Sequence, residues 1–238
     1  MSTNYSRDFF RSPRNLGIFA IIGLGLLGFS ELLAAGFGFG QILSPELSID
    51  MDDGTSESVW AMVQVLLILL QVPLYIFTAI MFLVWVNRAN KNMAPLMAGN
   101  TEFTSGWAVG WWFVPFASLY KPFQVVREIW WESNPEISDE PTFLTESLRS
   151  APKYMGVWWT FWLLSNFAWN ITGRLWDPDD LSGVAFYGFL FIITGILSAA
   201  AAVLAIMVVR DITKRQEMRF ANLGALQHFA PPPPPNFG

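Results

Sequence analysis

Four long apolar stretches alternate with polar stretches along the 238-residue chain. They lie at about residues 16–40, 59–86, 156–176 and 184–209. A helix needs roughly 20 apolar residues to cross the hydrocarbon core of a bilayer, and each stretch is about this long or longer. The pattern therefore predicts an all-α integral membrane protein with four transmembrane helices.

The polar segments between and beside these stretches differ in the sign of their charged residues. The linkers at 41–58 and 177–180 contain carboxylates and no Lys or Arg, and of the 14 basic residues only Arg174 lies on their side. The other basic residues lie in 1–14, 87–153 and 210–238. By the positive-inside rule these three segments, and both termini, are expected in the cytoplasm. The four helices then form two hairpins in a membrane domain at 15–209.

Composition narrows the chemistry that this chain could carry. Hydrophobic residues make up 53% of the chain and charged residues 14%, and the chain has one histidine, His228, and no cysteine. Disulfides, thiolate metal sites and cysteine nucleophiles are therefore excluded, and the sequence lacks phosphate-binding glycine motifs and the basic stripe of a nucleic-acid protein. We expect no catalytic residues, no metal and no cofactor.

A short motif occurs twice, each time before a hairpin. Residues 11–18, RSPRNLGI, resemble residues 149–157, RSAPKYMGV. One interpretation is a parallel repeat related by a twofold axis along the membrane normal. The other is that basic residues, a proline and a glycine are a common start for a helix.

The linker between the hairpins contains a Trp-rich segment at 106–131. Its run from Gly106 to Phe116 is too short to cross, so it would lie in the interface, re-enter the bilayer, or pack between the hairpins. After Pro115 a second, amphipathic helix is expected along the cytoplasmic surface. Its apolar positions are Leu119, Phe123, Val126 and Trp130. The candidate interfacial or partner-binding residues are Trp107, Trp111, Trp112, Pro115, Pro122, Arg127, Glu128 and Trp130.

Arg127 and Glu128 are adjacent in sequence, so they cannot pair with each other on a helix. We expect them to contact other elements, such as Arg88 or the glutamates that follow, and to fix the surface helix against the ends of the spans.

Among the polar residues within the predicted spans, five are candidates for an intramembrane polar cluster: Glu31, Gln64, Asn166, Asn170 and Arg174. Asn166, Asn170 and Arg174 recur every four residues and therefore share one helical face. Glu31 is the only carboxylate within a span, and we expect it to meet Asn170 or Arg174. Such residues are either hydrogen-bonding contacts between helices or part of an ion or proton path.

Three stretches carry a resemblance to a known family. VNRANKN at 86–92, the segment from GWAVGWW to REIW at 106–130, and ITKRQ at 212–216 are similar to the bacterial membrane family with domain of unknown function 4328. The resemblance covers about residues 59–217. It implies a multi-pass protein of a bacterial plasma (inner) membrane, and it implies no activity.

These features favour a non-enzymatic accessory or scaffold subunit of a membrane complex. Its expected partners are membrane lipids, and other membrane proteins or further copies of the chain; the polyproline run at 231–235 could bind a proline-recognising module, and no nucleic acid is expected. The alternative is a binder of lipid, quinone or pigment, or a small transporter, with a polar cleft between the hairpins.

Overall fold

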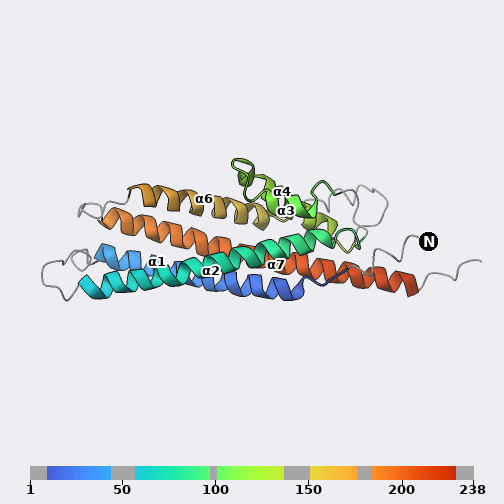
Figure 1. The fold of residues 1–238 in the computed structure, drawn as a ribbon, viewed down its shortest axis with the longest axis horizontal. Helices are drawn as coiled ribbons and strands as arrows, with labels where there is room; N and C mark the ends of the chain where they lie inside the picture. The colour runs from blue at the N-terminus through green and yellow to red at the C-terminus, as the bar shows by residue number, and fades with distance from the viewer. Residues whose placement is uncertain (1–9, 44–56, 97–100, 137–150, 176–183, 229–238) are drawn as a thin grey trace, which may run out of the picture. The chain divides into compact units, whose positions relative to one another are not determined.

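The computed structural model describes residues 10–43, 57–96, 101–136, 151–175 and 184–228, and every element within these ranges is a helix (Figure 1). The predicted all-α fold is therefore confirmed for this part of the chain. In chain order the helices are α1 (Arg14–Leu43), α2 (Glu57–Lys91), α3 (Ser105–Gly110), the 3-10 helix η3 (Ala117–Leu119), α4 (Lys121–Glu132), α6 (Lys153–Leu175) and α7 (Val184–His228).

Some predicted features lie outside the described residues. They are most of the acidic linker at 41–58, the acidic turn at 177–180, most of the N-terminal segment 1–14 and the polyproline run at 231–235. The side chain of Gln64 also lies outside them, although its backbone belongs to α2.

Within the described residues, three helices are long and apolar enough to cross a membrane. These candidate spans are Arg14–Gly40, Val65–Lys91 and Phe186–Ala225, with mean hydropathy values of 2.1, 2.4 and 2.6. Apolar residues on them remain exposed, including the consecutive pair Leu69 and Leu70. Exposed apolar residues all around a helix are typical of lipid contact. α6 is not among the three, so the count of four spans stays a prediction.

The chain forms two compact units. Unit 1 consists of residues 1–14, 86–151 and 210–238, and unit 2 consists of residues 15–85 and 152–209. Unit 1 gathers nearly the same three segments that contain the basic residues.

Glycines bring α1 and α7 close together in unit 2. A Cβ atom added at Gly188 would lie 2.7 Å from the carbonyl oxygen of Gly38, and one added at Gly195 would lie 2.6 Å from that of Glu31. No larger residue fits without a shift of the backbone. Small residues allow such close approach between membrane helices, where packing replaces the hydrophobic effect as the driving force.

The other helices of unit 2 are held by side chains. The Gln71 amide of α2 contacts Glu31 of α1, and Thr78 of α2 packs against Gly23 of α1. Aromatic pairs complete the packing: Phe82 of α2 with Trp158 of α6 at 6.1 Å between ring centroids, and Trp169 of α6 with Phe191 of α7 at 6.4 Å. Each of the four helices thus contacts two others.

Candidate functional site

A buried hydrogen-bond network centres on Gln216 of α7 in unit 1. The fully buried Gln216 side chain donates from Nε2 to the carbonyl oxygen of Ala89 at 2.8 Å and to Ser133 Oγ at 3.1 Å. Its Oε1 accepts a hydrogen bond from Asn92 Nδ2 at 3.0 Å. Both ends of the amide are therefore satisfied, as a buried amide requires. One side chain thus joins α2, the residues after α4, and α7.

Asn92 extends this network to the N-terminal segment. Its Nδ2 also donates to the carbonyl oxygen of Arg11 at 2.9 Å, and the Arg11 N–H donates to Asn92 Oδ1 at 3.3 Å. Beside this contact, Ser12 Oγ donates to a Glu217 carboxylate oxygen at 2.7 Å, and the rings of Phe10 and Phe220 stack at 4.2 Å. Residues 10–12 are therefore attached to α7 and to the residue that follows α2.

Arg219 forms the second centre of the network. Its Nε donates to the carbonyl oxygen of Leu96, and its Nη1 donates to those of Glu132 and Asn134, all at 2.9 Å. The last carbonyl groups of a helix lack partners within the helix and carry partial negative charge, so a guanidinium suits the end of α4. The side chain is buried, and these hydrogen bonds offset the cost of burying its charge.

The Trp-rich segment is attached to the end of α2 through two asparagines. Asn87 Nδ2 donates to the carbonyl oxygen of Ser105 at 2.7 Å, and Asn90 Nδ2 donates to that of Phe103 at 3.2 Å. Glu128 of α4 accepts hydrogen bonds from the N–H groups of Glu102 and Phe103, the latter at 3.4 Å. Residues 102–105 are therefore held between α2 and α4.

The predicted break and second helix are present. α3 ends at Gly110, η3 follows Pro115, and α4 contains Pro122 in its first turn, where a missing N–H costs nothing. The buried face of α4 comprises Pro122, Val125, Val126, Ile129 and Trp130. Of the predicted stripe, this face contains Val126 and Trp130. Phe123 is half-buried, and Leu119 lies in η3 and is exposed, so those two positions were predicted wrongly.

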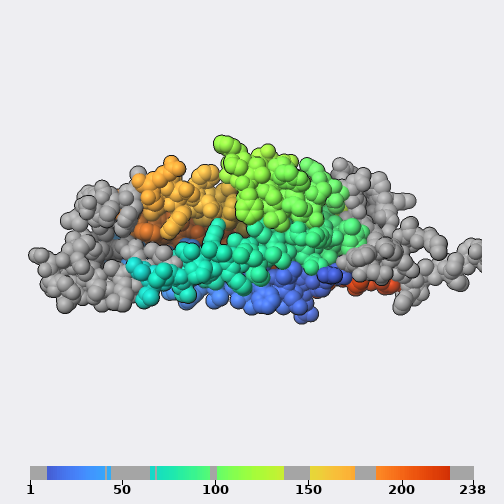
Figure 2. Space-filling model, viewed as in Figure 1, coloured from blue at the N-terminus to red at the C-terminus, as the bar shows by residue number. Residues whose placement is uncertain are grey.

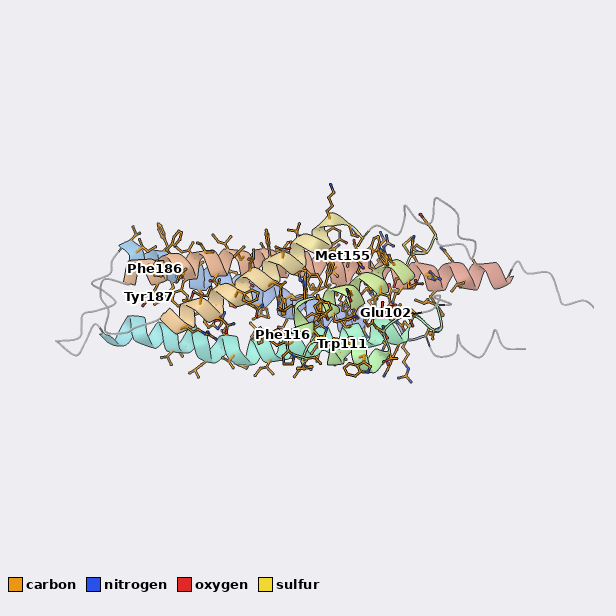
Figure 3. The ribbon with its side chains drawn as sticks, turned by 90° about the horizontal axis from the view of Figure 1, so that it is seen from above. Glu102, Trp111, Phe116, Met155, Phe186 and Tyr187 are labelled. Atoms are coloured by element: carbon orange, nitrogen blue, oxygen red, sulfur yellow. The ribbon has the colours of Figure 1, made fainter. Side chains whose placement is uncertain are left out.

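The tryptophans of the motif do not form its most exposed surface. Trp130 is buried and Trp111 and Trp112 are half-buried, whereas Phe113 is 72% exposed and Phe116 83% exposed. Trp111 and Phe116 are labelled in Figure 3. We name the large apolar side chains that are exposed in this segment the aromatic edge: Trp107, Phe113, Phe116, Leu119 and Tyr120. In Figure 2 the segment that carries it is part of the green surface. Sequence reasoning missed Phe113 and Phe116, because Trp is the usual indicator of an interface.

Phe116 has a strained backbone. Its φ is 61° and its ψ is −43°, and it is the non-glycine residue with positive φ in the described part of the chain. A bulky side chain in this conformation costs on the order of 1–3 kcal/mol and persists only when the surrounding structure imposes it. Such strain is concentrated at functional sites.

Cations of unit 1 contact aromatic rings. The Arg215 guanidinium lies 3.6 Å from the ring centre of Trp130, and that of Arg127 lies 4.7 Å from the ring centre of Trp131. Lys121 lies 5.1 Å from the ring centre of Phe103 and forms an ion pair with Glu102 at 3.6 Å. The guanidinium of Arg127 also lies 5.9 Å from the ring centre of Phe123, and since Phe123 and Trp131 both belong to α4, neither contact attaches Arg127 to another element.

Glu128, by contrast, does contact another element, but through backbone N–H groups instead of a basic side chain. Burial raises the pKa of the Glu128 carboxyl above its ordinary value, although the two N–H groups act in the opposite direction. The neighbouring carboxylates of Glu102 and Glu132 add to the rise in this pKa.

A shallow depression of about 380 Å³ lies beside residues 102–105. Its lining residues are Asn90, Lys91, Met93, Ala94, Thr101, Phe103, Thr104 and Ser105. Among the described residues, no three His, Asp or Glu side chains converge where they could hold a metal ion.

The polar residues of unit 2 are placed differently from our expectation. Gln71 Nε2 donates to Glu31 Oε1 at 2.8 Å, so the partner of Glu31 is Gln71, and the expected contact with Asn170 or Arg174 is wrong. Both of those residues are exposed on α6. Asn170 donates to the carbonyl oxygen of Asn166 in its own helix, and Asn166 to that of Trp162. Spacing identifies the residues that share a face of α6, but it does not tell which helix that face meets.

Comparison with known proteins identifies a family but no individual relative. No curated protein and no solved structure matches this chain. A family model matches residues 52–214, which is well over half of the chain. Two of the three stretches that carry the resemblance, 86–92 and 106–130, lie within this match, and the third, 212–216, meets its end. All three lie in unit 1. The chain therefore belongs to the family described as domain of unknown function 4328.

Proposed function

We propose that this protein is a non-enzymatic accessory or scaffold subunit of a membrane complex. The observation that carries the proposal is the use of the buried polar groups in unit 1. Gln216 and Arg219 direct most of their hydrogen bonds at backbone carbonyl oxygens of Ala89, Leu96, Glu132 and Asn134. Groups used in this way hold chain segments together and are not available to a substrate.

The outer surface of unit 1 supports the same proposal. The aromatic edge is exposed, and the ionisable side chains near it contact rings, as Arg127 contacts Trp131, or backbone N–H groups, as Glu128 does. A unit that is held together by buried hydrogen bonds and carries apolar aromatic side chains on its surface is better suited to binding other molecules than to catalysis.

We also propose a topology with four spans in a bacterial plasma membrane and both termini in the cytoplasm. α6 has 23 residues and is therefore about 34 Å long, which is enough to cross the hydrocarbon core. The distribution of basic residues supports the orientation. The natural chain has no cysteine, so Asp52→Cys and Lys214→Cys can be labelled directly. We expect Asp52→Cys to react only with reagent outside the cell; the reverse pattern would refute the orientation.

The scaffold proposal is tested by extraction from native membranes in a mild detergent, followed by sizing and mass spectrometry. We expect the wild-type chain to run in a defined larger assembly with other proteins. Arg219→Ala should reduce the recovery of those proteins several-fold, because it frees the segments around α4. Arg210→Ala is the matched control, because Arg210 is exposed on the same helix. A wild-type chain that runs without any other protein contradicts the proposal.

A second candidate function is binding of a lipid, quinone or pigment, or small-molecule transport. The hydrogen bond between Glu31 and Gln71 supports it, since an ionisable residue inside a candidate span marks a functional site by default. Mass spectrometry of the same extract detects a bound small molecule. We expect Glu31→Gln to remove it if this candidate is correct, and unchanged content excludes the residue.

A further inference from the structure

The aromatic edge is attached to the point where the chain leaves a candidate span. The span in α2 runs from Val65 to Lys91, and its last turns belong to unit 1. Asn87 on those turns donates to the carbonyl oxygen of Ser105, the first residue of α3, and Asn90 donates to that of Phe103, two residues earlier. Arg88 directly follows Asn87 and Lys91 directly follows Asn90, and basic side chains at the end of a span mark the level of the lipid headgroups. α3 therefore begins at this level.

The backbone of the segment fits the headgroup region and no deeper layer. α3 has six residues and η3 has three, with turns between them. Irregular backbone exposed to the hydrocarbon core would leave N–H and carbonyl groups without partners. At the headgroup level water supplies those partners, while apolar side chains reach the acyl boundary.

The side chains of the edge have the matching chemistry. Trp107 and Tyr120 each combine an apolar ring with a polar group, which is why these residues concentrate at the membrane interface. Phe113 and Phe116 lie between them and are the more exposed. Lys121 follows Tyr120 directly, and a cation at this place is attracted to a surface of anionic lipid.

The conformation of Phe116 is the strongest indication. Its φ of 61° is one that glycine adopts freely, yet the chain has a phenylalanine there with 83% of its surface exposed. The turn around Phe116 is closed by a hydrogen bond from the Ala117 N–H to the carbonyl oxygen of Pro115 at 2.7 Å. The ring itself lies outside, so packing of the ring inside the unit does not offset the strain. A surrounding of lipid repays it by taking the ring out of water.

We propose that the aromatic edge inserts into the headgroup region of the bilayer and holds unit 1 on the membrane surface. Its principal inserting residues are Phe113 and Phe116, not the tryptophans of the motif. This inference goes beyond the scaffold function and does not depend on it, because lipid alone is the partner.

The test places a fluorescent probe on single cysteines of the full-length chain in purified-lipid vesicles. The variants are Phe113→Cys and Phe116→Cys, labelled with an environment-sensitive dye, in vesicles of equal parts phosphatidylcholine and phosphatidylglycerol. Glu136→Cys is the control, since Glu136 is exposed, belongs to unit 1 and lies outside the three candidate spans. We expect lipids brominated in the acyl chains to quench the first two labels, and aqueous iodide to quench the control several-fold more strongly. Equal iodide quenching at all three sites overturns the proposal.

A second variant separates insertion from folding. Phe116→Gly relieves the backbone strain, so the thermal midpoint should not fall, while the label at Phe113→Cys in this background should become several-fold more accessible to iodide. A label that stays protected shows that Phe116 does not drive insertion and refutes the assignment. If iodide reaches the labels in lipid vesicles but not in native membranes, a protein covers the aromatic edge. This result also refutes the proposal that the edge inserts into lipid. Neither result bears on the co-extraction test, so the two proposals can fail separately.

Discussion

Asn92 and Gln216 are 124 positions apart in sequence, yet their side-chain amides share a hydrogen bond of 3.0 Å in the interior of unit 1. Asn92 follows α2 directly, and Gln216 lies on α7. Each amide also binds a backbone carbonyl oxygen, that of Arg11 for Asn92 and that of Ala89 for Gln216. The pair therefore joins the N-terminal segment, α2 and α7.

Replacing Gln216 with Ala should destabilise the protein by about 2–3 kcal/mol. The change leaves the Ala89 carbonyl oxygen and the Asn92 amide buried without this partner, and each such group costs on the order of 1–3 kcal/mol. Thermal unfolding in detergent measures the effect. The exposed neighbour Lys214→Ala provides the control, and equal midpoints for the two variants would show that the network contributes no stability.

Replacing Arg219 with Lys should fail to preserve stability although the charge is kept. Three carbonyl oxygens accept from Nε and Nη1, and an ammonium group cannot reproduce that planar arrangement. We expect a loss of about 2 kcal/mol, measured by thermal unfolding. Arg210→Lys, on an exposed position of the same helix, should change little. A stable Arg219→Lys protein would mean that charge alone matters there.

Glu128 should make stability depend on pH. Its folded-state pKa is raised above the ordinary value of 4.5, so the folded protein binds this proton more tightly than the unfolded chain. The folded state therefore loses stability as the pH rises from 4.5 through the raised pKa. Glu128→Gln removes this titration. The thermal midpoint of wild type minus that of Glu128→Gln should fall as the pH rises from 4.5 toward neutrality, and a difference that rises would contradict the assignment.

Gly188→Ala should disturb the packing of α1 against α7. The new Cβ would meet the Gly38 carbonyl oxygen at 2.7 Å and Ile42 Cγ1 at 2.8 Å. Overpacking of this kind costs about 1–3 kcal/mol. Gly36→Ala on α1 is the matched control, because nothing lies within 4 Å of a Cβ there. The thermal midpoints in detergent should separate the two variants, and equal values would refute the close contact.

The predicted elements and the observed ones agree where local pattern decides the outcome. A run of apolar residues longer than a bilayer is thick can satisfy its backbone only as a helix, and this predicts α1, α2 and α7. Pro115 and Pro122 predict the break before α4 and the start of that helix, because proline suits a turn or a first helical turn.

Local sequence pattern did not predict which polar residues are buried or which partners they bind. Gln216 and Arg219 lie among charged residues that resemble a solvated tail, so their burial has no local signal. The available indication was that Gln216 is the last residue of the family stretch ITKRQ and that Arg219 follows it three positions later. The expectation for Glu31 named Asn170 or Arg174 and not Gln71, because the sequence does not tell which helices are neighbours.

The sequence by itself determined the helices, the apolar length of the spans, the family, and the segments that carry charge. Only the tertiary structure decided that Gln216 and Arg219 organise unit 1, that Gln71 is the partner of Glu31, and that Phe116 lies outside with a positive φ. The physical reason is that helix formation in a bilayer depends on neighbouring residues. Hydrogen bonding and burial depend on which distant segments meet.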